Sequence, residues 1–120
     1  MNKSVLITMA TLLVSGSFAN GALAAPESKC KTCHSFEKDG GNKMGPNLFG
    51  IVGKKAGSSE GYKYGDFLSS ADFTWDEENL KAWLEDSKGV AKAGGGSKMP
   101  SQKLKGKKAD DVIAFLSSLK

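Results

Sequence analysis

The sequence contains no arginine, since all 17 of its basic residues are lysines, and it has only two cysteines, one histidine and three prolines. Without the arginine side chains that read bases and phosphates, its formal net charge of +4 fits an acidic protein partner better than a nucleic acid. Two cysteines allow at most one disulfide. A chain of 120 residues has room for one small domain, whose core is marginal unless a disulfide, a metal or a cofactor adds to it.

Long hydrophobic runs are also scarce, and the longest lies at the N-terminus. A lysine at position 3 precedes a mostly apolar stretch over residues 5–19, and Ala22-Leu23-Ala24 supplies the small residues of a signal-peptidase site. We therefore predict a cleaved secretory signal over residues 1–24 and a mature domain over residues 25–120, exported into an oxidising compartment. The alternative is an uncleaved membrane anchor, but serines and an asparagine interrupt the stretch before it reaches about 20 apolar residues.

Both cysteines and the only histidine fall in one pentapeptide, Cys30-Lys31-Thr32-Cys33-His34. This C-x-x-C-H pattern is typical of covalent haem attachment, in which the two thiols reach the two vinyl groups and the imidazole lies under the iron. A structural zinc site would need four nitrogen or sulfur ligands, and the chain has only these three. A thioredoxin-like dithiol would need a β-α-β setting, which the sequence does not show. We therefore expect one haem c, covalently bound through Cys30 and Cys33.

The spacing of apolar residues predicts helices and loops. A T-x-x-E capping box at residues 74–77 begins an amphipathic helix that ends near Ser87. A last helix carries Asp110 and Asp111 in its first turn and an apolar stripe at helical spacing. The stripe consists of Val112, Ile113, Leu116 and Leu119. A short helix is expected at residues 64–70, and no segment alternates long enough for a strand, so we predict an all-α fold around a cofactor.

Several motifs occur in the order found in a known family. They are the C-x-x-C-H pentapeptide, Gly45-Pro46-Asn47-Leu48-Phe49-Gly50, Gly61-Tyr62-Lys63-Tyr64, Phe73-Thr74-Trp75 with the helix after it, Ser97-Lys98-Met99-Pro100 and the amphipathic last helix. Through them the sequence from about Lys29 to Lys120 resembles the class I monohaem cytochromes c of mitochondria and bacteria. The resemblance implies the small cytochrome c fold, in which helices and loops wrap around one haem.

The residues alone leave the second iron ligand open. No other histidine is present, and cleavage of the signal would leave two methionines, Met44 and Met99. Met44 lies shortly after His34, whereas Met99 follows a glycine-rich loop that can carry a thioether to the far face of the ring. The resemblance favours Met99, because the corresponding loop of the family carries the axial methionine. With His34 and Met99 filling both axial positions, the iron is suited to electron transfer rather than to gas or peroxide chemistry.

The resemblance also implies roles for residues around the haem. The carbonyl of Pro46 would accept the Nδ1–H of His34, which fixes the tautomer and strengthens the ligand. Tyr64 and Trp75 match positions that donate hydrogen bonds to a buried haem propionate, and both keep their donors. These residues complete the expected cofactor-binding set.

Three features depart from the family. Lys54 stands where many relatives carry an arginine that also contacts the propionate. Trp83 replaces a common tyrosine beside the axial methionine, which removes a hydroxyl. Cleavage after residue 24 would leave only five residues before Cys30, too few for the helix that relatives pack across their last helix. We therefore expect the apolar stripe of the last helix to lack part of its cover, and the protein to self-associate weakly through it.

Charge is distributed unevenly along the chain. Residues 88–108 contain seven lysines and no acid, whereas residues 60–86 contain eight acids and two lysines. The basic segment flanks Met99, so positive charge around the haem edge would steer acidic docking surfaces of membrane redox complexes or oxidases toward it.

Coordination and charge together, read with the resemblance, predict a periplasmic carrier of single electrons. It would shuttle them from a quinol-oxidising membrane complex to a terminal oxidase, reductase or other acceptor. It would be no enzyme and would have no small-molecule substrate. The alternative from another class is a small haem peroxidase or gas sensor, in which Met99 is absent from the iron or bound to it only weakly.

Overall fold

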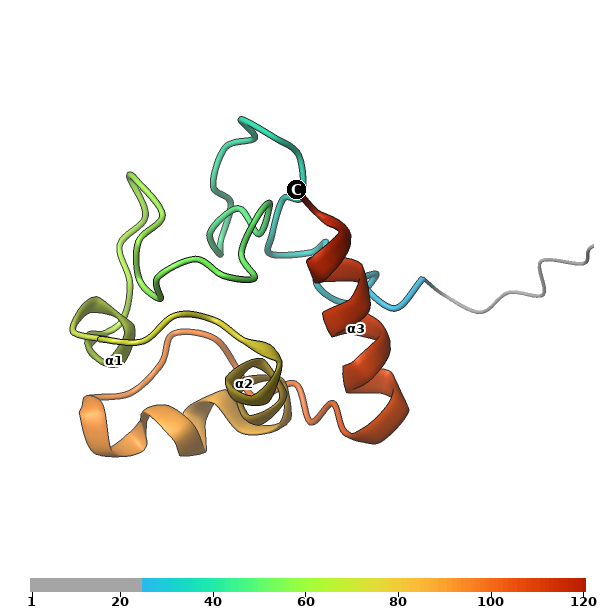
Figure 1. The fold of residues 1–120 in the computed structure, drawn as a ribbon. Helices are drawn as coiled ribbons and strands as arrows, with labels where there is room; N and C mark the ends of the chain where they lie inside the picture. Colours follow the sequence, from blue (N-terminus) through green and yellow to red (C-terminus); the bar gives the residue numbers. More distant parts are fainter. Residues whose placement is uncertain (1–24) are drawn as a thin grey trace, which may run out of the picture.

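The computed structural model describes residues 25–120, so the predicted signal peptide over residues 1–24 lies outside the described residues. The described chain forms α1 (Asp66–Ser69), α2 (Glu77–Ala91), the 3-10 helix η1 (Lys92–Gly94) and α3 (Gly106–Ser118), which long loops connect (Figure 1). In this part of the chain the only β-type pairing is an isolated bridge, and none of the helices is long and apolar enough to cross a membrane. The prediction of an all-α fold is confirmed.

Helix α2 begins two residues later than the sequence predicts. Its N-cap is Asp76, whose carboxylate accepts from the Asn79 amide at 2.8 Å, while the Asn79 side chain accepts from the Asp76 amide at 2.8 Å. Asp and Asn are at least as good as Thr at this position, so this second capping box prevails over the one at residues 74–77. Thr74 pairs instead with Lys55 in the isolated bridge. At the other end, the predicted end near Ser87 is wrong: the backbone leaves the helical region at Asp86, and the helix then continues to Ala91.

Helix α3 begins about one turn earlier than predicted, at Gly106, so Asp110 and Asp111 lie in its second turn. Neither carboxylate therefore faces the unpaired amides of the first turn. Both form ion pairs: Asp110 with Lys81 of α2 at 2.8 Å, and Asp111 with Lys107 at 2.7 Å. The longer helix places Lys107 four residues before Asp111, which is the spacing that brings two side chains together on a helix surface.

The apolar stripe of α3 is buried, which corrects the expectation that it lacks cover. Val112, Ile113 and Leu116 are 1%, 5% and 3% exposed. Leu119, beyond the last turn, packs against the same core while partly buried. Part of the cover comes from α2, which contacts α3 directly. The predicted exposed stripe is therefore wrong, and self-association through it loses its structural basis.

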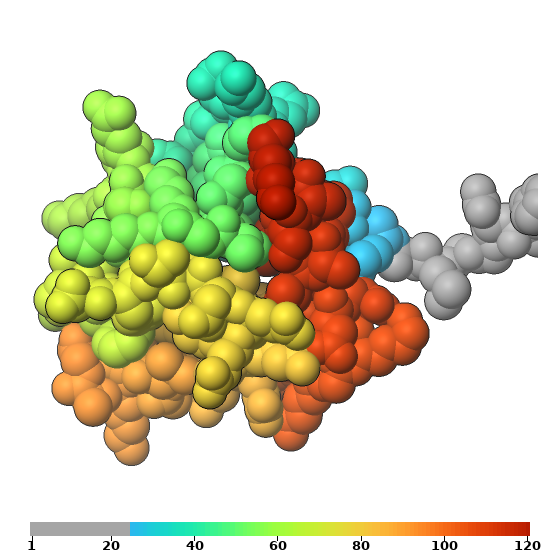
Figure 2. Space-filling view, viewed as in Figure 1, coloured from blue at the N-terminus to red at the C-terminus, as the bar shows by residue number. Residues whose placement is uncertain are grey.

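Within residues 25–120, the rest of the cover comes from the turns around the cysteines. Residues 25–34 form successive turns, with the His34 amide donating to the Cys30 carbonyl at 2.9 Å. Cys30 belongs to the core cluster, and the Phe36 ring meets Phe115 of α3 edge-on at 5.3 Å. Figures 1 and 2 show this segment, in blue, against the red helix α3. Side chains at and after the first cysteine thus cover part of the apolar stripe of α3.

We predict that Leu116→Ala lowers the free energy of unfolding by about 2–5 kcal/mol, because it deletes a buried side chain from the contact between α3 and the rest of the core. Chemical denaturation followed by circular dichroism measures the change. The matched control is Leu119→Ala, at the partly buried C-cap of α3, which should cost clearly less. Equal losses of unfolding free energy in the two variants would contradict the deeper burial of Leu116.

Candidate functional site

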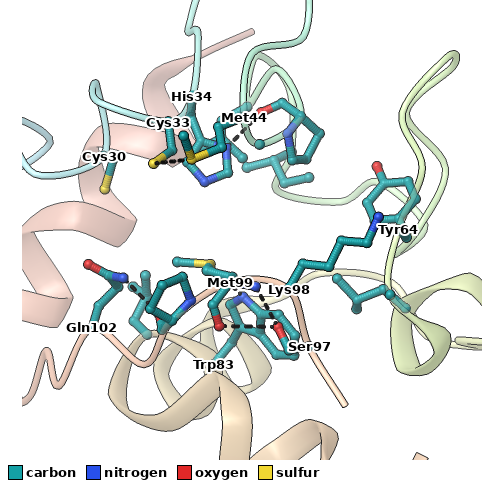
Figure 3. Close-up of a pocket in the computed structure, with 18 of the residues that line it drawn as sticks. Cys30, Cys33, His34, Met44, Tyr64, Trp83, Ser97, Lys98, Met99 and Gln102 are labelled. Atoms are coloured by element: carbon teal, nitrogen blue, oxygen red, sulfur yellow. Dashed lines mark hydrogen bonds between the residues drawn. The ribbon is translucent and has the colours of Figure 1, made fainter. Parts of the chain in front are cut away.

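A largely apolar cavity of about 510 Å³ lies between the cysteine turns, the two long helices and the loop before α3. Its volume falls within the range of cofactor and small-molecule sites. Figure 3 shows two facing walls: one carries Cys30, Cys33, His34 and Met44, and the other carries Met99 and Trp83. Every residue of the predicted cofactor-binding set lines this cavity. They are Cys30, Cys33, His34, Pro46, Tyr64, Trp75 and Met99.

Tight turns bring the two thiols and the imidazole to the first wall. The amides of Cys33 and His34 both donate to the Cys30 carbonyl, at 3.1 and 2.9 Å, so the pentapeptide forms one helical turn. Both cysteines are free thiols. Burial, and next the negative charge of Glu27, raise the pKa of Cys30, which keeps this thiol protonated at neutral pH.

The imidazole of His34 is held in one orientation. Its Nδ1 lies 2.7 Å from the Pro46 carbonyl oxygen, which can only accept, so Nδ1 carries the proton and Nε2 keeps its lone pair. Burial lowers the pKa of His34, and the bond to Pro46 opposes this in part; the ring is therefore neutral near pH 7. The hydrogen bond between His34 and Pro46 that the sequence predicts is present.

Gly45 supports the same ring, a role that sequence reasoning missed. A Cβ at this position would lie 2.7 Å from His34 Nδ1, so a larger residue would displace the imidazole. The Gly45 amide also donates to the Cys33 carbonyl at 2.6 Å. A glycine directly before a proline, shortly after the C-x-x-C-H pentapeptide, is the sequence signal that could have indicated this close approach.

Met99 occupies the facing wall, where Trp83 of α2 donates its indole N–H to the methionine sulfur at 3.3 Å. Trp83 is 5% exposed, and its ring stacks on Phe67 at 6.0 Å. The sequence indicated only that a hydroxyl is lost at this position. The structure shows that a hydrogen-bond donor is kept beside Met99, because the indole N–H of Trp83 takes the place of the hydroxyl. A buried tryptophan needs a partner for its N–H, and this need was the missed signal.

The two methionines lie on different walls. Met44 is 79% exposed, and its sulfur lies 3.9 Å from Cys33 Sγ, beside the histidine (Figure 3). Met99 is partly buried against the core and faces this wall across the cavity. A group bound to His34 from inside the cavity would therefore present its opposite side to Met99 and not to Met44.

The two side chains expected near a propionate also lie at the cavity. Trp75 is 6% exposed, and the Tyr64 oxygen accepts from the Ser59 amide at 2.9 Å, which leaves the Tyr64 O–H able to donate. Lys54 does not line the cavity; its carbonyl accepts from the Trp75 amide at 2.9 Å. The Lys54 side chain is therefore not placed to contact a propionate in the cavity, although the resemblance implied such a contact.

The other readings of the cysteines find little support in residues 25–120. This part of the chain holds no cluster of three or more histidine, cysteine, aspartate or glutamate side chains that could bind a metal ion, as a structural zinc site requires. It also lacks the paired strands of a thioredoxin-like setting.

Comparison with known proteins points to the family that the sequence resembles. A family model described as cytochrome c matches residues 18–120. The chain is 42% identical over 94 residues to cytochrome c of Gibberella zeae, with 75% of this chain and 83% of that protein covered. It is 38% identical over 113 residues to cytochrome c-550 of Novispirillum itersonii, with 88% and 100% covered. The solved structure of cytochrome cH from Methylobacterium extorquens aligns with a TM-score of 0.65 at 42% identity, with 78% and 91% covered.

The fold and the cavity define a small all-α protein built around a cofactor site. With these matches, the chain belongs to the cytochrome c family, the electron-transfer proteins that carry haem c. The predicted family and the small cytochrome c fold are confirmed.

Proposed function

We propose that this protein is a one-electron carrier with a single haem c, attached through Cys30 and Cys33 and ligated by His34 Nε2 and Met99 Sδ. The observation that carries the proposal is that both thiols and a neutral imidazole face a thioether across one mostly apolar cavity. Two nitrogen or sulfur ligands on opposite sides fill the axial positions of a haem iron. This ligand set favours electron transfer over peroxidase or gas-binding chemistry.

The chain's own residues hold this geometry and set the environment. The Pro46 carbonyl keeps the proton on His34 Nδ1, and Gly45 packs against the ring, so Nε2 stays directed at the cavity. The haem, when bound, supplies the one-electron couple, while buried apolar side chains keep water away from it. Trp83 donates its N–H to the Met99 sulfur, which would weaken electron donation from that sulfur and favour the reduced state of a bound haem. Tyr64 and Trp75 would donate hydrogen bonds to the propionates.

Partners would dock at the mouth of the cavity. Three exposed lysines line it, Lys29, Lys63 and Lys98. Lys98 Nζ donates to the Lys63 carbonyl at 2.8 Å, which positions its charge without neutralising it. Elsewhere in the basic segment Lys105 and Lys107 pair with carboxylates. The lysines at the mouth would steer acidic surfaces of a quinol-oxidising complex and of a terminal oxidase or reductase.

Export completes the proposal. The predicted signal over residues 1–24 would deliver the domain over residues 25–120 to the periplasm, where the donor and acceptor complexes present their docking surfaces. Relatives named cytochrome c2 and cytochrome c-550 in bacteria support this assignment.

We expect Met99→Ala to abolish the long-wavelength charge-transfer band that sulfur ligation gives ferric haem, to lower the reduction potential and to open the iron to carbon monoxide. The reason is that the thioether stabilises ferrous iron and occupies the sixth position. Absorption spectroscopy with a redox titration measures all three. Met44→Ala is the matched control and should change none of them. If instead Met44→Ala loses the band and Met99→Ala keeps it, the ligand assignment is wrong.

Trp83→Phe should lower the reduction potential by up to about 60 mV, because it removes the N–H donor to the sulfur while keeping a ring in the stack. One hydrogen bond contributes about 0.5–1.5 kcal/mol, and about 59 mV corresponds to a tenfold change for one electron. Protein-film voltammetry measures the shift. As a control, Phe67→Leu disturbs the same stack but leaves the donor in place. A potential that falls equally in both variants would attribute the effect to packing.

Oxidation of the reduced protein by ferricyanide, an anionic probe, should slow as salt is added, because the Debye length shortens from ~30 Å at 0.01 M to ~10 Å at 0.1 M. Lys98→Glu should slow the reaction severalfold at low salt, since it reverses a charge at the mouth of the cavity. Lys120→Glu makes the same charge change away from the mouth and should have a smaller effect. Stopped-flow kinetics tests this, and rates independent of salt in the native protein would refute electrostatic steering.

A further inference from the structure

Helix α2 breaks at Asp86, whose backbone (φ −151°, ψ 76°) lies outside the helical region although helix continues on both sides. The Asp86 carboxylate accepts from the Gly89 amide at 3.0 Å and from the Ser101 hydroxyl at 2.7 Å. Asp86 therefore acts as a cap inside the helix. One of its two partners lies two residues beyond Met99, so the break is tied to the loop that carries the methionine.

The break also redirects backbone groups of α2 toward the returning chain. In a continuous helix the carbonyls of Leu84 and Glu85 would accept from amides four residues later. Here they accept from the Leu104 and Lys103 amides, each at 3.1 Å. The Lys88 amide donates to the Ser101 hydroxyl oxygen at 3.2 Å. Residues 84–88 and 101–104 are thus joined by hydrogen bonds.

Met99 itself is held through its backbone. Ser87, directly after the break, is fully buried, and its hydroxyl donates to the Met99 carbonyl at 2.9 Å. On the other side, the Ser97 hydroxyl oxygen accepts from the Met99 amide at 3.0 Å. Residues 94–96 before this point are all glycine, so the chain leading to Met99 has little conformational preference of its own.

Gly89 is part of the same arrangement. A Cβ at Gly89 would lie 2.7 Å from Asp86 Cγ, so the carboxylate can fold back onto this turn only where residue 89 has no side chain. The hydrogen bond from Ser101 and, second, that from the Gly89 amide lower the pKa of Asp86, which keeps it ionised at neutral pH.

We propose that Asp86, Ser87 and Ser101, here called the Met99 clamp, are positioning residues that hold the Met99 sulfur at the cavity and keep an external ligand from taking its place. Asp86 and Ser87 lie on α2 and Ser101 lies in the loop after Met99, so Met99 is held by hydrogen bonds to its backbone and to the residues that follow it. The inference rests on the proposed function in one respect, that Met99 is the ligand displaced.

Imidazole binding to the ferric holoprotein tests the clamp, because an external ligand binds only the fraction of molecules in which Met99 has left the iron. Removing one neutral hydrogen bond should raise that fraction roughly fivefold. Ser87→Ala and Ser101→Ala should therefore each raise the apparent imidazole affinity about fivefold. Asp86→Ala should raise the apparent imidazole affinity at least as much. Asp86→Asn keeps an acceptor oxygen, so its imidazole affinity should stay close to that of the native protein.

Two controls separate positioning from general destabilisation. Asp76→Ala removes a similar carboxylate cap from the other end of α2, so it should lower global stability without changing imidazole affinity. Ser118→Ala removes a hydroxyl bonded to the Phe115 carbonyl on the surface of α3 and should change neither. Clamp variants whose imidazole affinity follows global stability along the same line as Asp76→Ala would overturn the proposal.

Amide hydrogen exchange gives a second readout that does not depend on the iron. In Ser101→Ala and Asp86→Ala the Lys103 and Leu104 amides should exchange faster, while amides in the last turns of α3 should keep their native rates. Unchanged exchange at Lys103 and Leu104 would overturn the clamp. A native ferric protein without a sulfur-to-iron band would refute the ligand assignment instead, so the two failures are distinguishable.

Discussion

The structure depends on an interior space that the chain surrounds and does not fill. Trp83 and Leu84 of α2 and Val112 and Leu116 of α3 belong to the buried core, and the same side chains line the cavity. A domain this small buries a limited share of its surface, so apolar walls facing an open space would weaken it considerably. A flat, largely apolar cofactor between the walls would supply the missing contacts. Stability and function therefore draw on the same side chains.

The two walls are held by different means. On the first, contacts fix the His34 ring itself: a single helical turn, the Gly45 approach and the Pro46 carbonyl. On the second, Met99 follows a glycine run and owes its position to α2, through Trp83 at the sulfur and Ser87 at the carbonyl. The imidazole is thus oriented through its own ring, whereas the thioether is held by one N–H at its sulfur and otherwise through the backbone of Met99. Exchange of a ligand is accordingly expected on the methionine side.

The sequence was most informative where chemistry leaves few choices. Cys30, Cys33 and His34 use every cysteine and histidine in the chain, so the first wall could be predicted from the motif. Exact helix boundaries could not be predicted, because both Thr74 and Asp76 are suitable caps; the Asp76–Asn79 capping box forms, and Thr74 pairs with Lys55.

Contacts distant in sequence were predicted less well, since they depend on where side chains meet in space. Part of the cover of α3 comes from Phe36, which lies after the cysteines, whereas the prediction considered only the residues before them. The sequence predicts that the helix ends near Ser87, whereas α2 breaks at Asp86 and continues to Ala91. The break could not be predicted, because nothing local shows that Ser87 and Ser101 will face the loop of Met99.

The turns that carry the thiols have a consequence for the order in which the domain assembles. Lys29 Nζ donates to the Gln102 carbonyl across 73 residues of chain, while Ser87 and Met99 are 12 apart. Contacts between distant residues form more slowly than local ones, because a longer stretch of chain must first be ordered. We therefore expect α2 and the Met99 loop to associate early and the cysteine turns to dock on α3 last. During that interval both thiols remain accessible to whatever attaches the cofactor, and docking then closes the domain around it.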